Sequence, residues 1–415
     1  MNIVIQNGRV IDPKNGVDRS MSLYIADGKV AGLGEAPAGF VAEQTIDAAG
    51  CVVCPGLIDL GARLNSIEAE LAAAVAGGVT SVVVPPDADP PLDEPELADR
   101  LVHRGAEIGK ARVLPLGALT LGLQGERLAE LAGLKKAGCV AFSQANRTVV
   151  DTEALLRAME YATTFGFAIW LQPQDYWLSR NGIAHEGEVS SRLGLAGIPV
   201  AAETIAIGTI IQLVRDTGCR VHLTRLSSAA GVALVQRGQH EGLPVTFDIG
   251  VHHLLLTEND IGYFDPHARF SPPLRAQSDR QALSNAAAAG LAAICSDHTP
   301  VGADDKLLPF GEAKPGATGL EVLLPLTLKW AEAARVSLPD ALARITSAPA
   351  AVLGLPCGEL GLGATADICI FDPAATWQLT PEALKSRGKN SPWLGYMMTG
   401  QVKSTLVGGR LVYQA

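Results

Sequence analysis

The chain has 415 residues, of which 48% are hydrophobic and 18% are charged, and its formal net charge is −10. This apolar content excludes a disordered chain and a mini-protein that depends on disulfide or metal staples. The acidic balance, without a basic block, argues against nucleic acid or an anionic membrane as the main partner.

Cellular location is predicted from the cysteines and the apolar runs. The 7 cysteines are an odd number without dense spacing, which is typical of a reduced, cytoplasmic protein. Apolar runs are short and interrupted by Gly, Pro or charge, so we expect no membrane span. The opening MNIVIQNGRVIDP lacks a basic stretch followed by an apolar one, so we expect no signal peptide.

Both ends of the chain have strand–turn–strand patterns. Asn7-Gly8, Asp27-Gly28 and Gly408-Gly409 are dipeptides typical of hairpin turns. Neither end is large enough for a credible domain of its own. We therefore assign residues 1–51 and 356–415 to the two parts of one small composite β-sandwich, as a hypothesis.

The middle of the chain, residues 52–355, alternates short β-branched runs with stretches of helical period. Strands are predicted at 52–60, 80–85, 112–118, 138–143, 167–172, 219–225, 244–250 and 292–296. Helices are predicted at 66–77, 94–108, 126–136, 151–165, 202–217, 228–241, 278–289 and 319–335, with Ser66 and Asp151 as N-caps. Eight strand–helix units predict an α/β fold, a (β/α)8 TIM barrel. The alternative, a doubly wound sheet, lacks G-x-G-x-x-G after the first strand.

At 55–65, PGLIDLGARLN resembles the first barrel strand of the cyclic amidohydrolases, specifically of dihydroorotase. Further blocks resemble dihydroorotase segments in the same order: HEGEVSSRLGLAGIPVAAE at 185–203, HLLLTENDI at 253–261, PPLR at 272–275, SDHTP at 296–300, PFGEA at 309–313 and TGLEVLLPL at 318–326. The resemblance implies a TIM barrel with a composite β-sandwich and a place in pyrimidine biosynthesis. It also implies zinc chemistry, in which a metal polarises an amide and lowers the pKa of water.

The family's metal ligands are missing at the positions that the resemblance assigns to them. The first strand ends in Gly61 and Arg63 where His-x-His is expected, and the fourth has Gln144 and Ala145 where the family has two carboxylates. Glycine offers no ligand atom, and arginine stays protonated.

The fifth and sixth strands lose their histidines as well. Gln172 and Arg225 stand at those positions, although His222 remains on the sixth strand. Substrate-contacting residues of the family are also replaced, and their positions hold Asn65, Asp87, Ser271 and Val301. We expect no tight divalent site and therefore no metal cofactor.

Only the eighth strand keeps the family pattern, as Asp297-His298. In the family this Asp binds metal and serves as general acid and base. We expect Asp297 to pair with Arg63 or Arg225, because an ion pair would offset its charge in a dry barrel mouth. Without a metal, a carboxylate alone supplies a rate factor on the order of 10²–10⁴.

Several other polar residues have a structural and a functional interpretation. Cys51-x-x-Cys54 could be half of a zinc ribbon or a redox pair, but core packing is favoured because no second pair follows at zinc-ribbon spacing. For His252-His253 and His222, a position in the barrel wall is favoured over metal ligation.

Three functional hypotheses remain. In the favoured one, the chain is a catalytically inactive dihydroorotase homologue with a structural role. Relatives of this type pair with aspartate transcarbamoylase, and the resemblance implies that partner in a hetero-oligomer, a dodecamer of six plus six chains. In the second, it is an amidohydrolase-type enzyme with a rebuilt, metal-free site around Asp297, His298, Arg63 and Arg225. In the third, that pocket is regulatory and binds a small anion, a nucleotide or carbamoyl aspartate, without turnover.

Overall fold

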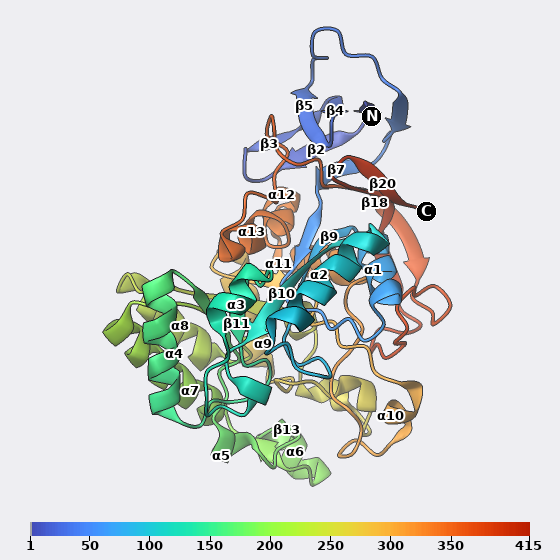
Figure 1. The fold of residues 1–415 in the computed structure, drawn as a ribbon. Coiled ribbons are helices and arrows are strands. Elements are labelled where there is room, and N and C mark those ends of the chain that lie inside the picture. Colours follow the sequence, from blue (N-terminus) through green and yellow to red (C-terminus); the bar gives the residue numbers. More distant parts are fainter. Residues whose placement is uncertain (1) are drawn as a thin grey trace.

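The computed structural model describes residues 2–415, and a parallel barrel lies at its centre (Figure 1). Eight strands form one sheet in the order β17-β16-β15-β12-β11-β10-β9-β8. They are β8 (Leu57–Asp59), β9 (Val79–Val84), β10 (Arg112–Ala118), β11 (Ala141–Ser143), β12 (Ala168–Leu171), β15 (Arg220–Leu223), β16 (Val245–Gly250) and β17 (Ala293–Cys295). A parallel bridge between Ala62 and His298 joins the two ends of the sheet, which confirms the predicted TIM barrel.

All eight predicted helices are present and follow the strands. They are α1 (Ile67–Ala76), α2 (Pro95–Ile108), α3 (Leu131–Lys136), α4 (Thr152–Phe165), α7 (Val200–Thr217), α8 (Ala229–His240), α9 (Gln277–Ala288) and α11 (Leu323–Ala334). Helix α3 begins later than predicted because Leu128 forms a β-bridge with Thr120 instead. Asp151 caps α4 by accepting the N–H groups of Glu153 and Ala154, whereas the Ser66 side chain makes no capping bond.

Shorter elements complete the barrel domain. They are α5 (Tyr176–Ser179), α6 (Glu188–Leu193), α10 (Ala303–Leu307), α12 (Leu338–Ala343), α13 (Ser347–Leu353), β13 (Ala184–His185), β14 (Gly197–Ile198), and the 3-10 turns η1 (Leu121–Leu123), η2 (Val251–Leu254), η3 (Glu258–Ile261) and η4 (Pro266–Ala268). Within residues 2–415, no helix is both long enough and apolar enough to cross a membrane.

The two chain ends share one β-sandwich, as predicted (Figure 1). Its four-stranded sheet contains β1 (Ile3–Gln6), β4 (Leu23–Ala26), β5 (Lys29–Leu33) and β6 (Gln44–Asp47). Its six-stranded sheet contains β2 (Arg9–Asp12), β3 (Val17–Ser20), β7 (Val52–Pro55), β18 (Ile368–Gln378), β19 (Met397–Val407) and β20 (Arg410–Gln414). Buried apolar side chains such as Ile3, Leu23, Val53, Ile370 and Leu406 fill the space between the sheets.

Two details of the sequence prediction are wrong. The strand predicted over 52–60 is two strands separated at Gly56, and β7 lies in the sandwich rather than the barrel. A side chain at Gly56 would collide with Thr80, so this close crossing requires glycine. The predicted Asn7-Gly8 hairpin is also absent, because β1 pairs with β4 and β6 whereas β2 pairs with β3 and β7. Asn7, with a φ of 63°, turns the chain from one sheet into the other.

The other two turn predictions are confirmed. Asp27-Gly28 joins the paired strands β4 and β5, and Gly408-Gly409 joins β19 and β20. Their φ values are all positive, at 50°, 75°, 56° and 72°. Two consecutive positive φ values are the geometry that a two-residue hairpin turn of this kind requires.

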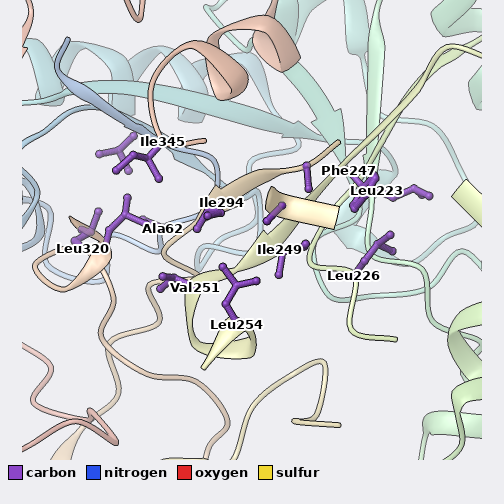
Figure 2. Packing of buried hydrophobic residues seen from close by; sticks show 14 of the residues in the cluster. Ala62, Leu223, Leu226, Phe247, Ile249, Val251, Leu254, Ile294, Leu320 and Ile345 are labelled. Atoms are coloured by element: carbon purple, nitrogen blue, oxygen red, sulfur yellow. The ribbon is translucent and has the colours of Figure 1, made fainter. Parts of the chain in front are cut away.

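The barrel core is continuous and apolar. Figure 2 shows part of it, with Phe247 beside Leu223 and Ile249 near Ile294, the pairs that strand register aligns. A separate buried cluster contains Leu60, Val83, Leu116, Ala141, Trp170, Ala293 and Cys295. Val82 and Val84 belong to the large core between the strands and the surrounding helices. Side chains alternate along a strand, so Val83 of β9 faces the opposite side, which is the barrel interior. The interior is therefore packed and leaves only its rim for function.

Candidate functional site

Residues from the ends of several strands meet at one mouth of the barrel. Arg63 follows β8, Asn146 follows β11, Arg225 follows β15 and Asp297 follows β17, and all four line the same small cavity. The carboxyl ends of parallel strands lie on one face of a barrel, so these side chains converge despite their distance in sequence. The mouth is the place where the family resemblance puts the metal.

Arg225 occupies the centre of this mouth. It is 8% exposed, with a φ of +56°. Its Nη1 donates to Asp297 Oδ1 at 2.6 Å, and its Nη2 donates to Gln172 Oε1 at 3.1 Å and to the Asn146 side chain. Burial lowers the pKa of Arg225, but the charge and hydrogen bond of Asp297 outweigh it and raise the pKa above its usual value. The predicted pairing of Asp297 with Arg225 is confirmed.

Arg63, the other arginine considered for Asp297, pairs elsewhere. Its Nε and Nη2 donate to Asp87 Oδ2 at 3.0 and 2.8 Å, and its Nη1 donates to Thr299 Oγ1 at 3.0 Å. Arg63 therefore offsets the negative charge that Asp87 brings to its substrate position. Each guanidinium at the mouth is already neutralised by a carboxylate of this chain.

The residues at the six ligand positions do not fit a zinc ion. Gly61 and Ala145 have no ligand atom, and Gln144 turns to Thr120, whose Oγ1 lies 2.9 Å from its Nε2. Gln172 is bound to Arg225, and a guanidinium contacts Asp297, the one carboxylate left. Across residues 2–415 no three His, Cys, Asp or Glu side chains are grouped to hold a metal.

His298 follows Asp297 in sequence but faces away from the mouth. Its Nδ1 accepts the N–H of Gly319 at 2.9 Å, so its Nε2 carries the hydrogen that it donates to Glu70 Oε2 at 2.9 Å. Burial raises the pKa of Glu70, but its interactions with His298, Ser386 and the Arg387 N–H together outweigh burial and lower the pKa overall. His298 therefore ties the barrel mouth to α1 and is not available as an acid or base.

The inner cavity around Arg225 and Asp297 is very small. Its volume is about 30 Å³. One water needs roughly 10–15 Å³ on this kind of measure, and pockets for drug-sized ligands reach ~300–1,000 Å³. The inner mouth therefore has room for one or two water molecules, at roughly 10–15 Å³ each, but not for a six-membered ring.

A wider vestibule lies outside the inner cavity. It has a volume of about 280 Å³ and is lined by Arg63, Asn65 and Val301, among others. Asn65 donates to the carbonyl of Pro300 at 2.8 Å, and the Val301 N–H donates to Asn390 Oδ1 at 2.9 Å. Ser271 lines neither space. With Asp87, which binds Arg63, three of the four substrate positions thus use polar groups to hold the chain itself.

Sequence reasoning missed Asp248, which lies near the carboxyl end of β16. Its Oδ1 accepts the Arg225 backbone N–H at 2.7 Å, and its Oδ2 contacts His222 Nε2 at 3.0 Å. His222 Nδ1 contacts Thr246 Oγ1 at 2.8 Å, so the structural role expected for His222 agrees with its contacts. The signal for Asp248 is its place at the carboxyl end of a predicted strand.

The remaining candidate residues, two cysteines and two histidines, pack in the cores or hydrogen-bond to neighbouring groups of the chain. Cys54 opposes Cys369 across β7 and β18 and belongs to the barrel-side core, whereas Cys51 packs against the sandwich core. The two cysteines therefore do not face each other. His252 Nδ1 accepts the Trp393 indole N–H at 3.0 Å, and His253 Nε2 donates to the Pro272 carbonyl at 3.1 Å.

Comparison with solved structures shows that the fold is shared with hydantoinases. The L-hydantoinase (dihydropyrimidinase) of Arthrobacter aurescens superposes with a TM-score of 0.88 at 24% identity, covering 99% of this chain and 96% of that chain. The Amidohydrolase family matches residues 188–413, and the Dihydro-orotase-like family matches residues 50–230.

Sequence relatives narrow the class. A "Dihydroorotase-like protein" of Pseudomonas putida is 43% identical and covers 100% of this chain and 99% of its own length. A "Dihydroorotase" of Syntrophotalea carbinolica is 39% identical with the same two coverages, 100% and 99%. The chain therefore belongs to the dihydroorotase-like family of amidohydrolases.

Proposed function

We propose that this chain is a catalytically inactive dihydroorotase-like subunit that assembles or stabilises aspartate transcarbamoylase in de novo pyrimidine biosynthesis in the cytoplasm. The observation that carries the proposal is the Arg225 guanidinium, held between Asp297, Gln172 and Asn146 where the family has its metal. Relatives of this chain are named both dihydroorotase and dihydroorotase-like protein. The proposed inactivity therefore rests on the side chains of the mouth, whereas the proposed partner rests on the family resemblance.

The chemistry argues against turnover. Opening a cyclic amide needs an electrophile for the carbonyl and an activated water. Asp297 is the only candidate base of the family pattern, and Oδ1 of this carboxylate already accepts from Arg225 at 2.6 Å. A free general base supplies on the order of 10²–10⁴, whereas enzymes reach about 10⁶ or more. The inner cavity of about 30 Å³ also leaves no space for the ring beside Asp297.

The structural role is supported by the intact scaffold of the chain. The barrel is closed by the Ala62–His298 bridge, and both chain ends complete the sandwich. A protein that keeps this scaffold without a metal site still offers a rigid surface to a partner. The family resemblance implies aspartate transcarbamoylase as that partner, in a complex of six plus six chains.

The alternative, in which the rebuilt pocket acts on or binds a small anion, has weaker support. Arg63 and Arg225 are each bound to a carboxylate, so an anion would have to displace Asp87 or Asp297 from a hydrogen-bonded pair. Displacing a carboxylate that already makes charge-assisted hydrogen bonds costs much of the affinity that the anion gains.

Co-expression with the aspartate transcarbamoylase of the same organism tests the structural role. We expect one large co-eluting complex in size-exclusion chromatography with light scattering, with transcarbamoylase activity higher or more stable than when that enzyme is expressed alone. Separate elution with full transcarbamoylase activity would overturn this role.

A second assay tests inactivity independently. Purified chain incubated with zinc should show no dihydroorotase activity and less than one zinc per chain, with an active dihydroorotase under the same conditions as the positive control. Turnover that depends on added zinc would contradict the proposal, whatever the result with the transcarbamoylase.

A further inference from the structure

A second cavity lies beside the barrel mouth, between α4, α5 and α7. Its volume is about 120 Å³, and Leu155, Leu171 and Ile210 in its lining are each 5% exposed. Tyr176 and Trp177 of α5 also line it and are 42% and 62% exposed. An engineered apolar cavity of ~150 Å³ binds benzene, so this space has the size of one planar ring.

One buried amide connects this cavity with the barrel mouth. Gln172 lines the cavity and is 7% exposed. Its Oε1 accepts from Arg225, and its Nε2 contacts Gln174 Oε1 at the long distance of 3.4 Å. An amide nitrogen carries two hydrogens, so one N–H of Gln172 has no acceptor among the described residues.

The edge of the cavity supplies a cation. Arg147 lines the cavity, and its guanidinium contacts only the carbonyl of Gly122, at 3.4 Å, within the described part of the chain. Asp175 also lines the cavity, and its Oδ1 accepts the Leu178 N–H, which holds this carboxylate at the start of α5. The cavity therefore offers apolar walls, the Gln172 N–H and the Arg147 guanidinium as donors, and one carboxylate, Asp175, that caps a helix.

We propose that this cavity binds a small planar ring that carries a carboxylate. The ring packs against Leu155, Leu171 and Ile210, and the carboxylate accepts from Gln172 Nε2 and Arg147. Apolar walls with a few converging polar groups are the usual make-up of a small-molecule site. Because the same amide contacts Arg225, a bound acceptor fixes the Gln172 side chain with Oε1 toward the barrel mouth. This site is separate from the proposed structural role and does not depend on it.

Benzoate is the probe for this site. Saturation-transfer NMR and isothermal calorimetry on the full chain should give a dissociation constant in the millimolar range for benzoate and weaker binding for benzyl alcohol, which lacks the charge. Arg147→Gln should weaken benzoate about tenfold and leave benzyl alcohol unchanged. Equal affinity of the two probes would overturn the choice of an anionic ring.

A pair of variants on α7 locates the binding. Ala206 lines the cavity, whereas Ala201 is exposed on the same helix and does not. Ala206→Phe should abolish benzoate binding, and Ala201→Phe should not change it, with the melting temperature of both confirming the fold. Benzoate binding that survives Ala206→Phe would overturn the proposal. The absence of benzoate binding to the unmodified chain would also overturn it. If, in that case, Ala206→Phe disrupts a protein complex, the cavity is part of a protein interface and not a small-molecule site.

Discussion

Two arginine–carboxylate pairs lie at the barrel mouth, and they differ in their surroundings rather than in their charges. The side chains of Arg225 and Asp297 are 9% and 4% exposed, whereas those of Arg63 and Asp87 are 15% and 24% exposed. Arg225 also donates to two side-chain amides, and Arg63 donates to one hydroxyl. The inner pair therefore closes the mouth, and the outer pair lies where water can replace a lost partner.

Removing the inner arginine should have the largest effect. Arg225→Met leaves Asp297 buried without a partner, so the free energy of unfolding should fall by about 3–5 kcal/mol. Urea denaturation measures this, and Arg225→Met with Asp297→Leu should recover most of the loss because no charge remains buried. A loss in Arg225→Met no larger than that of Arg63→Met would contradict the difference drawn between the two pairs.

The second largest effect on stability should come from acid pH. The guanidiniums of the two pairs stay charged at every pH considered, but the buried His252 side chain can gain a proton. Burial lowers the pKa of His252 to about 3. The unfolded chain then binds the proton below about pH 6.5, so stability is full above that pH and falls as the pH drops toward 3. The loss should reach about 2 kcal/mol at pH 5, measured by urea denaturation across pH.

The control for this pH dependence is a matched pair of variants. His252→Gln keeps an acceptor for the Trp393 indole and should reduce the slope of stability between pH 6.5 and 5, while the buried His253 and His185, whose pKa values are also lowered, keep part of it. His103→Gln, at a histidine whose side chain is 72% exposed, should leave the slope unchanged. An unchanged slope in His252→Gln would show that another group causes the acid sensitivity.

Removing the outer arginine should cost less. Arg63→Met should lower the free energy of unfolding by no more than about 1 kcal/mol, because Arg63 and Asp87 are partly exposed to water. In a double-mutant cycle, the coupling of Arg63 with Asp87 should shrink at high salt, and that of Arg225 with Asp297 should not. Equal salt dependence would mean that the two pairs are equally hydrated.

Restoring one histidine should have no effect on metal binding. Arg225→His adds one imidazole beside Asp297, but Gly61, Ala145 and Gln172 still supply no anionic or imidazole ligand, so tight zinc binding should not appear. Metal analysis after zinc incubation and desalting measures this. One zinc per chain in this variant would show that the mouth rearranges more freely than its contacts indicate.

Much of the fold could be predicted because its signals are local. β-branched runs separated by amphipathic stretches located all eight barrel strands, and turn residues located two hairpins. The same local chemistry does not distinguish a hairpin from a corner between sheets, so the Asn7-Gly8 pattern predicts a hairpin where the structure has a corner. The break at Gly56 depends on its contact with Thr80, which only the packed structure determines.

The sequence predicts which charged residues lie at the candidate site, but it does not predict which arginine pairs with Asp297. Asp297 needed a cation, and two arginines at strand ends were candidates for it. Asp87 settles the choice by binding Arg63 from the end of the neighbouring strand β9. The acceptors Asn146 and Gln172 and the cavity beside α5 depend on side-chain directions beyond the strand ends, which sequence periodicity does not specify.

The pairing of β7 with β18 also has a consequence for synthesis of the chain. Strand β7 ends at Pro55 and β18 begins at Ile368, so the six-stranded sheet joins the first and last segments to leave the ribosome. Until β18 is made, Val53 and its neighbours have no partner strand on that side and expose an apolar edge. The barrel segments are complete before the sandwich, and contacts this distant in sequence form slowly. A nascent chain of this protein therefore carries an unpaired edge at its amino end through nearly the whole of translation.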